Sequence, residues 1–445
     1  MLMGKSSVFK HPGVKAFFLY FVASQINDPL SVNFGGVPVT PLQIAILAGV
    51  AMNIKYWSPF VYKKLSLFYL FLLVIVFYTL VKLLSEGEMN LYFLTFTFNL
   101  LWVTTVSSSI VKIPIRKADY ILILQRLILL LIPSVLFGMY ELVTNKYAFP
   151  EGLGGAMKQG IDEGNFYVRG GFRDKFDFSS FIVLAPIIYL SCYFNDIKFS
   201  LLYKLIAFIS VILLLSSYSS SVIIAFGVVV IYCFVFIANL RKSLGLVAFA
   251  VILIIGSLTY ITQSNIYKTQ MNAYNLKYQR QVEDKDESSF RWVAFNVGME
   301  HFLDRPFLGF GLDNSKKVIF KYAPTISPKP TNSHNYFVNN LVDFGLLGFS
   351  ILTGALVSLF LFYRKIRKWR SLIKPMADLV TLLLIFNVIT FQTYYHTFDR
   401  SMYFILIFLI FLYFSLKLND ESAGMRTQDL SGGRRNPGVE VGSGA

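Results

Sequence analysis

The segment LSLFYLFLLVIVFYTLVKLL, residues 65–84, decides the fold class of this chain. It holds a single charged residue, Lys82, and a helix of about 20 apolar residues is long enough to cross the hydrocarbon core of a bilayer. A second such run, MYFILIFLIFLYFSLKL, occupies residues 402–418. Neither run alternates apolar with polar residues, as the strands of a membrane barrel do. Both runs therefore predict membrane-spanning helices.

The composition of the whole chain agrees with this interpretation. Of its 445 residues, 55% are hydrophobic and 15% are charged, and the mean hydropathy is +0.58. Soluble domains carry about 25% charged residues. We expect an all-α polytopic integral membrane protein with about 12 transmembrane helices, by the spacing of its apolar segments. The predicted spans lie near residues 14–27, 39–54, 65–84, 91–112, 119–141, 178–195, 200–216, 220–239, 244–262, 336–362, 376–396 and 401–417.

Only two connecting segments exceed the length of a short loop. The predicted organisation is five spans in residues 1–141, a long loop at 142–177, four spans in 178–262, a second long loop at 263–335, three spans in 336–418 and a tail at 419–445. The tail is polar and rich in glycine, which predicts disorder. Long loops usually carry function, so the two loops are where a site is expected.

Basic residues in the short loops give the orientation, because lysine and arginine stay on the cytoplasmic side. One side carries Lys63, Lys64, Arg116, Arg241, Lys242 and the segment 364–374, whereas the short loops 28–38, 85–90 and 217–219 on the other side carry no lysine or arginine. Both termini and the tail are then cytoplasmic, and both long loops are extracytoplasmic. The net charge of +16 follows from this topology and predicts no nucleic-acid partner.

Metal and disulfide chemistry have little support. The two cysteines, Cys192 and Cys233, fall inside predicted spans and are expected to be apolar packing residues. Asp284 and Asp286 resemble the Asp-x-Asp of metal-dependent sugar transferases, but clustered acids in a solvated loop are usually a hydrated surface. We expect no metal site and no cofactor.

The first long loop ends in NFYVRGGFRDKFDFSSF, residues 165–181. Arg169 and Arg173 flank Gly170 and Gly171 just before a predicted span. A guanidinium offers a planar fork of donors that suits phosphate oxygens, and the glycines permit a tight turn close to a ligand. The alternative is that the arginines cap a helix or meet lipid headgroups.

The second long loop contains ESSFRWVAFNVGMEHFLDRPFLGFGLDNS, residues 287–315. Arg291, Phe295 and Met299 recur at helical spacing, which predicts an amphipathic helix at the membrane surface. Pro306 ends this helix, and Gly309 and Gly311 are the turn residues that follow. The aromatic residues are more typical of packing than of binding, but an arginine on an apolar face requires an anion.

The loop closes with SHNYFVNNLVDFGLLG, residues 333–348. His334 and Gly345 are eleven residues apart, which is three helical turns, so a continuous helix places both on one face. Gly345 and Gly348 then allow neighbouring helices to approach. His334 is expected at the membrane surface beside the long loops, either as a functional group or as a helix cap.

These motifs together resemble the O-antigen ligase and O-antigen polymerase superfamily over residues 165 to 350. The resemblance rests on Arg169 and its glycines, on Arg291, and on the runs RPFLGFGLDNS and SHNYFVNNLVDFGLLG. The chain departs from the family pattern in two places. SSYSSS, residues 216–221, lacks the arginine of a Ser-Arg pair, and Arg305-Pro306 replaces an Asn-Pro.

The resemblance implies a metal-independent, inverting glycosyltransferase of the bacterial inner membrane, with its site facing the periplasm. The donor is an undecaprenyl-diphosphate-linked glycan, and the acceptor is another glycan or lipid A core. His334 is then the catalytic residue that acts on the acceptor hydroxyl, and Arg169, Arg291 and Arg173 bind the diphosphate. The supporting residues are Gly171, Gly311, Asn335 and Gly345. A chain-length regulator is a candidate partner.

Polymerase and ligase share this donor, and the sequence favours neither strongly. We take polymerisation of O-antigen or related repeat units as the first hypothesis and ligation to lipid A core as the second. A flippase or another transporter is a third, although charges here lie mostly in loops and span ends rather than at the bilayer midplane. A non-catalytic scaffold has no need of arginines opposite a histidine.

Overall fold

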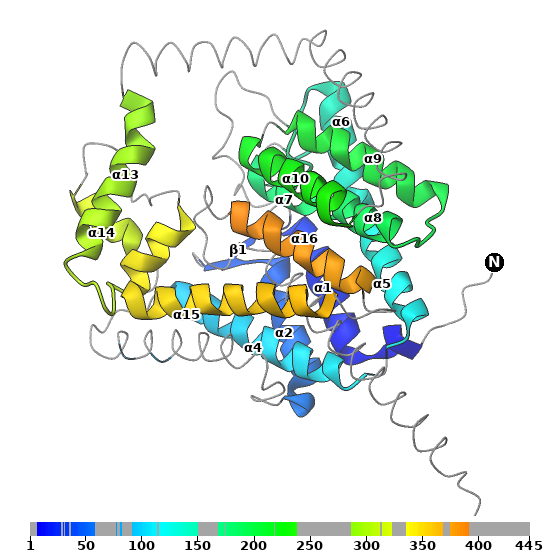
Figure 1. The fold of residues 1–445 in the computed structure, drawn as a ribbon, viewed down its shortest axis with the longest axis horizontal. Coiled ribbons are helices and arrows are strands. Elements are labelled where there is room, and N and C mark those ends of the chain that lie inside the picture. The colour runs from blue at the N-terminus through cyan, green and yellow to red at the C-terminus, as the bar shows by residue number, and fades with distance from the viewer. Residues whose placement is uncertain are drawn as a thin grey trace, which may run out of the picture.

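The computed structural model describes the chain in segments, and all statements below concern those segments. They are residues 7–27, 30, 32–34, 37–57, 77, 81, 91–113, 115–149, 168–172, 174–217, 219–237, 286–311, 314–322, 335–367 and 374–390. Almost all of their regular structure is helical, as Figure 1 shows, so the all-α expectation is confirmed for them. The exception is a hairpin of β1 (Val32–Phe34) and β2 (Val37–Val39), in which Asn33 lies opposite Pro38.

Most of the described helices lie on predicted apolar segments. Before the first long loop these are η1 (Ser7–Lys10), α1 (Pro12–Ile26), α2 (Pro41–Asn53), η2 (Ile54–Tyr56), α4 (Leu91–Val111), α5 (Lys117–Leu130) and α6 (Ile132–Thr144). After it come α7 (Lys175–Ile182), α8 (Leu184–Phe194), α9 (Leu201–Ser216), α10 (Ser220–Tyr232), the π-helix η4 (Cys233–Ile237), α13 (Asp286–Phe302), α14 (Ser315–Tyr322), α15 (Tyr336–Arg367) and α16 (Lys374–Thr390). Helices α13 and α14 lie instead in the predicted second long loop.

Local sequence explains where several helices begin. At α2, the Thr40 side chain accepts a hydrogen bond from the Gln43 backbone N–H, and the Gln43 side chain accepts one from the Thr40 N–H. This is a reciprocal capping box, and Pro41 at the first helical position has no N–H that needs a partner. Helix α1 begins in a similar way, because Nδ1 of His11 accepts a hydrogen bond from the Gly13 N–H and Pro12 follows the cap.

Two predicted spans are broken by proline. The sequence predicts single helices at 119–141 and 178–195, whereas the structure divides them into α5 and α6 and into α7 and α8. Pro133 and Pro186 lie just after the two breaks, and proline cannot donate to the carbonyl four residues earlier. Each divided segment, Ala118–Thr144 and Lys175–Phe194, is still long and apolar enough to cross a membrane by length and composition.

These are the two candidate spans among the described residues, and the shorter apolar helices include Leu201–Ser216 and Ser221–Ile237. The total of about twelve spans therefore stays a prediction. The predicted spans at 65–84, 244–262 and 401–417 lie outside the described residues, apart from residues 77 and 81.

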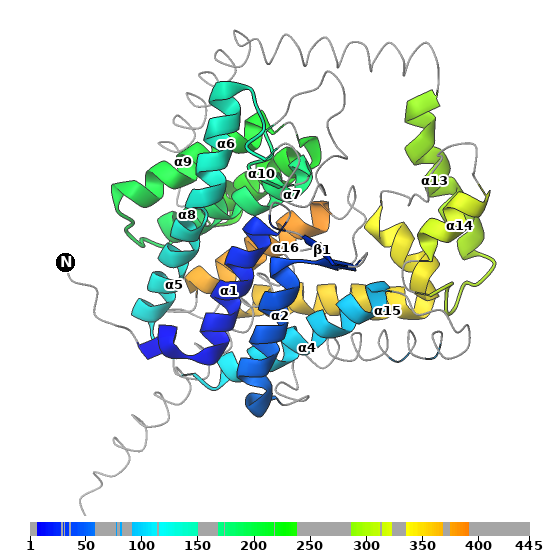
Figure 2. The same ribbon diagram turned by 180° about the vertical axis from the view of Figure 1, so that it is seen from behind.

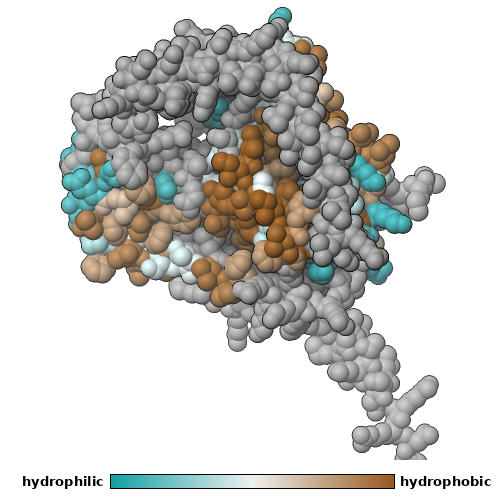
Figure 3. Space-filling model, turned by 45° about the horizontal axis from the view of Figure 1, so that its top comes forward, coloured by the Kyte–Doolittle hydropathy of each residue, from teal (hydrophilic) through white to brown (hydrophobic). Residues whose placement is uncertain are grey.

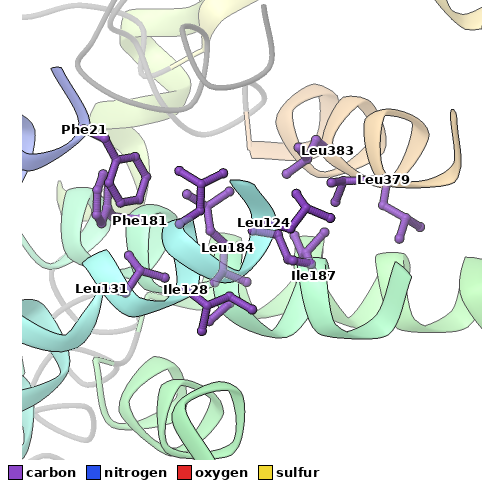
Figure 4. Close-up of a cluster of buried hydrophobic side chains, with 14 of the residues drawn as sticks. Phe21, Leu124, Ile128, Leu131, Phe181, Leu184, Ile187, Leu379 and Leu383 are labelled. Atoms are coloured by element: carbon purple, nitrogen blue, oxygen red, sulfur yellow. The ribbon is translucent and has the colours of Figure 1, made fainter. Parts of the chain in front are cut away.

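The centre of the molecule is a close-packed apolar core shared by α1, α5, α7, α8 and α16. Figure 4 shows side chains from these helices meeting in one cluster, and the labelled ones are at most 1% exposed: Phe21, Leu124, Ile128, Leu131, Phe181, Leu184, Ile187, Leu379 and Leu383. Inside a bilayer the lipid tails are as apolar as leucine, so such a core is held by van der Waals packing between helices. Cys192 and Cys233 form no disulfide within the described residues and both are buried, as expected of packing residues.

Apolar side chains also cover the outside of several helices. On α6, Leu136, Tyr140 and Val143 are 61%, 49% and 74% exposed and lie on one helix face. Helix α10 exposes Ile224, Val228 and Ile231 in the same spacing, and Figure 3 shows a broad apolar area on one face of the molecule. A soluble domain rarely exposes such continuous apolar surface, so these faces fit contact with lipid.

Buried polar side chains in these helices bond to their own helix. Hydroxyl and amide groups donate to the carbonyl four residues earlier at Ser24, Ser210, Thr381 and Asn387, with distances of 2.7–2.9 Å. In hydrocarbon a polar group without a partner is costly, and a carbonyl of the same helix supplies one.

Helices α13 and α14 stand apart from the central core. In Figures 1 and 2 they lie with the first half of α15 at one side of the molecule, while α6, α7, α9 and α10 lie at the other. Phe302, Val318, Val338 and Val342 form a small separate core for this module. The two sides hold the two groups of functional residues described next.

Candidate functional site

The first group is the arginine turn, residues 168–172, which lies just before α7. Its backbone is held by Glu141, a fully buried residue near the end of α6. The backbone N–H groups of Arg169 and Gly170 both donate to Oε2 of Glu141, each at 2.7 Å. The N–H of Ala148 donates to Oε1 of the same carboxylate at 3.1 Å. One carboxylate therefore joins two segments near the two ends of the first long loop.

The Arg169 side chain is fully buried, which contradicts the alternative that it meets lipid headgroups. Its Nη2 donates to the Phe149 carbonyl at 3.0 Å, and its guanidinium carbon lies 4.0 Å from the centre of the Tyr147 ring. Nε and Nη1 have no hydrogen-bond partner among the residues that the structure describes. A buried cation with two unsatisfied nitrogens is costly, and an anion would satisfy both charge and donors.

Glycine is required beside this arginine. Gly170 and Gly171 have φ of +54° and +86°, a region that L-residues with a side chain rarely adopt. A Cβ added at Gly170 would lie 2.2 Å from the Phe178 ring. The turn can therefore pack on α7 only with glycine at this position, as the two glycines in the sequence indicated.

The second group is the glycine joint, in which residues 306–311 run beside a break in α15 at residues 342–347. At Gly345 the backbone is non-helical, with φ of 63° and ψ of −168°, so the predicted continuous helix across Gly345 is wrong. Four backbone hydrogen bonds join the two segments: Phe310 N to Val342 O at 2.8 Å, Gly311 N to Asp343 O at 2.7 Å, Leu346 N to Pro306 O at 2.7 Å and Leu347 N to Phe307 O at 3.2 Å. The loop thus replaces helical bonds that the break removes.

The glycines of the joint permit backbone-to-backbone contact. A Cβ at Gly345 would lie 2.4 Å from the Phe307 carbonyl, and one at Gly309 would lie 2.5 Å from the Asp343 carbonyl. Gly345 was expected to admit a neighbouring helix, whereas the segment that approaches it is the loop at 306–308. Gly309 and Gly311 have φ of +67° and +104°, as turn residues should.

Two polar residues complete this side. Oδ1 of Asp343 accepts from the Ser315 N–H at 2.7 Å, which caps the start of α14. Oδ1 of Asn335 accepts from the N–H groups of Phe337 and Val338 at 3.0 and 3.1 Å, which caps α15. Asn335, a predicted supporting residue, is therefore the cap, and the helix begins after it.

The structure places the predicted site residues in two groups. Arg169 and Gly171 lie in the arginine turn, while Gly311, Asn335 and Gly345 belong to the module at the other side in Figures 1 and 2. Arg291 belongs to α13, but its side chain lies outside what is described. His334 and Arg173 also lie outside the described residues, so their roles stay predictions.

Sequence reasoning missed Glu141, Tyr147 and Asp343. A signal existed for Glu141, because it ends an otherwise apolar helical segment, and an ionisable residue in a span usually has a functional partner. No comparable signal marked Tyr147, one of 26 tyrosines. Asp343 was visible within an apolar stretch, but its partner at Ser315 follows from the tertiary fold.

Residues 205–353 match the family model described as O-antigen ligase. No curated protein matches the chain. The matched segment includes most of α9, all of α10, α13 and α14, and the glycine joint, whereas Glu141 and Arg169 precede it. The match covers residues 205–353 of the 445-residue chain, and it agrees with the resemblance to the O-antigen ligase and polymerase superfamily that the sequence motifs carried.

Proposed function

We propose that the protein is a membrane glycosyltransferase that moves a glycan from undecaprenyl diphosphate to an acceptor hydroxyl at the periplasmic face of the bacterial inner membrane. The acceptor in this proposal is a second carrier-linked repeat unit, so the product is an O-antigen or related polysaccharide. The observation that carries the proposal is the buried Arg169 guanidinium with two unsatisfied nitrogens. The family match supports the glycan-transfer class.

Arg169 suits the diphosphate because a guanidinium donates two parallel hydrogen bonds to phosphate oxygens. Negative charge grows on the departing diphosphate during the reaction, so the guanidinium stabilises the transition state more than the bound donor. Fixed donors in a site shielded from water stabilise developing charge strongly, which lets arginines act without a metal ion. Arg291 and Arg173 stay predicted contacts of the same diphosphate, although α13, which carries Arg291, lies at the other side of the molecule from α7 and the arginine turn in Figures 1 and 2.

His334 is the proposed general base. Its neutral imidazole takes the proton of the acceptor hydroxyl while that oxygen bonds to the anomeric carbon of the donor sugar. The bond between this carbon and the diphosphate oxygen breaks, and undecaprenyl diphosphate leaves with the electron pair. Attack from the side opposite the leaving group inverts the anomeric centre.

Ligation to lipid A core is the second candidate, because the matched family is described as O-antigen ligase. Both reactions use the same donor chemistry and differ in the acceptor. Twelve spans, cytoplasmic termini and a chain-length regulator as partner also belong to the proposal rather than to the observations.

The test is transfer by purified protein in lipid vesicles, with carrier-linked repeat units as the sole glycan. A polymerase forms a ladder of products, and His334→Ala abolishes the ladder while His334→Asn does not restore it. If a ladder appears only after lipid A core is added, the protein is a ligase. If His334→Asn retains full activity, the imidazole takes no part in transfer and the proposed base is wrong.

A further inference from the structure

The carboxylate of Glu141 has an unusual set of partners. It is buried beside a buried arginine, yet among the described residues it forms no ion pair with the guanidinium. Both oxygens accept instead from backbone N–H groups, two on Oε2 and one on Oε1. The carboxylate is held by three backbone donors and makes no hydrogen bond to Nε or Nη1 of Arg169.

The positions of those backbone donors matter for the guanidinium. Oε1 holds Ala148, and the residues on either side of Ala148 are the two that contact the Arg169 side chain: the Tyr147 ring lies at 4.0 Å and the Phe149 carbonyl at 3.0 Å. Oε2 holds the backbone of Arg169 itself and of Gly170. One side chain thus fixes both the arginine and the surface on which it lies.

We propose that Glu141 is a positioning residue for the diphosphate group of the glycan donor. By joining the 147–149 segment to the arginine turn, it holds the Arg169 guanidinium against Tyr147 with Nε and Nη1 available to phosphate oxygens. This inference rests on the proposed function, since it assigns the anion that Arg169 binds. Glu141 itself touches no phosphate, because its oxygens already have partners.

A different role for Glu141 is that of a counter-ion that only balances the charge of Arg169. The two roles respond differently to substitution. Glu141→Asp keeps the charge but is one methylene shorter, so it cannot reach both segments. Glu141→Gln keeps the length, but its NH₂ group must face a backbone N–H on one side. Positioning requires both the charge and the length, whereas charge balance tolerates aspartate.

The experiment measures the affinity for undecaprenyl diphosphate and the KM for the carrier-linked donor, with full-length protein in lipid nanodiscs. We expect Arg169→Ala to weaken binding of undecaprenyl diphosphate at least tenfold, and Glu141→Gln and Glu141→Asp to weaken it about tenfold each, while the acceptor KM changes less than about threefold. In the Arg169→Ala background, Glu141→Gln should add less than about threefold, because residues that act through one another are not additive.

Asp119→Asn is the matched control. It removes a carboxylate from the same helical segment, near the start of α5, where Asp119 accepts from the Arg116 N–H at 3.2 Å. We expect donor KM and carrier affinity of this variant to equal those of the wild type. A loss of affinity as large as that of Glu141→Gln would mean that any lost carboxylate has this effect, which overturns the inference.

A second variant tests the same geometry without changing the buried carboxylate. Tyr147→Leu removes the ring that the guanidinium faces, and we expect it to weaken binding of undecaprenyl diphosphate about three- to tenfold, as a cation–π contact of this kind predicts. If both Glu141 variants fail to insert into the membrane, the affinity of Tyr147→Leu for undecaprenyl diphosphate tests the inference alone. An affinity equal to that of the wild type overturns it.

The failures of the two proposals are distinguishable. If Arg169→Ala binds undecaprenyl diphosphate as the wild type does, the diphosphate site of the proposed function is wrong. If Arg169→Ala is impaired but Glu141→Asp is not, Glu141 is a counter-ion and the positioning role is wrong. Fully additive effects in the double variant also overturn the positioning role.

Discussion

The arginine turn and the glycine joint each fix two distant chain segments against one another, but by different means. In the arginine turn a single side-chain carboxylate accepts three backbone N–H groups. In the glycine joint the segments bond backbone to backbone, with glycine where a Cβ would collide. The first arrangement leaves a buried guanidinium with unsatisfied donors, while the second satisfies the backbone groups that the helix break exposes. A buried donor without a partner requires an explanation, which the proposed diphosphate supplies for Arg169, whereas the backbone bonds of the glycine joint are complete without a ligand.

The largest effect is expected from Arg169. Arg169→Ala should lower glycan transfer by about 10²- to 10³-fold, as loss of one donor to developing charge does in other enzymes. Arg169→Lys should recover part of this activity, because lysine keeps the charge but lacks the planar fork. The measurement is the transfer rate in vesicles with equal amounts of inserted protein. Unchanged activity in Arg169→Ala would mean that the arginine turn, like the glycine joint, has only a structural role.

A smaller effect, on stability rather than chemistry, is expected at the joint. Gly345→Ala places a Cβ 2.4 Å from the Phe307 carbonyl at a φ of +63°. Backbone strain and overpacking of this kind cost about 2–5 kcal/mol together. The measurement is the free energy of unfolding of the purified protein in detergent.

Gly354→Ala is its matched control, because Gly354 lies in the same helix with no atom within 4 Å of the added Cβ. Alanine is favoured over glycine in a helix by about 0.5–1 kcal/mol, so this variant should be slightly more stable than the wild type. If Gly345→Ala and Gly354→Ala have equal free energies of unfolding, the glycine joint does not require glycine at residue 345.

The smallest effect concerns pH. Burial of His11, and then the nearby charge of Lys55, lowers the pKa of this histidine. The neutral ring caps α1 through Nδ1, and protonation removes that acceptor. A lowered pKa means that the unfolded chain binds the proton more readily, so the stability due to His11 is complete above the unfolded pKa of about 6.5 and is lost as the pH falls through the folded pKa.

The loss should be below about 1 kcal/mol, since a helix cap contributes about that much. His11→Asn keeps a cap that does not titrate, and it should remove this part of the pH dependence of the unfolding temperature. The same variant also helps to interpret the pH dependence of glycan transfer. If the transfer rate of His11→Asn still declines as the pH falls, the decline does not arise from His11. Unaltered pH dependence of unfolding in His11→Asn would contradict the assignment.

The helices on apolar segments, such as α4 and α9, were predictable from apolar length, whereas α14 was not, because it is short and carries three lysines. The need for glycine at residues 170, 171, 309 and 311 was also predictable. The breaks were not predicted, although Pro133 and Pro186 are visible in the sequence, because apolar periodicity does not report where a span is divided. Burial of Arg169 was also unpredictable. It depends on Glu141 and the 147–149 segment, which only the tertiary fold brings to the turn.

The glycine joint separates residues whose identity is fixed by geometry from residues that can vary. Hydrogen bonds between backbone groups are indifferent to the side chains that the same residues carry. Geometry therefore constrains residue identity at Gly309 and Gly345, while Phe307 and Leu308 point outward with 72% and 54% of their surface exposed. Phe307 and Leu308 can therefore be exchanged for other residues without loss of the four backbone hydrogen bonds, whereas Gly309 and Gly345 cannot.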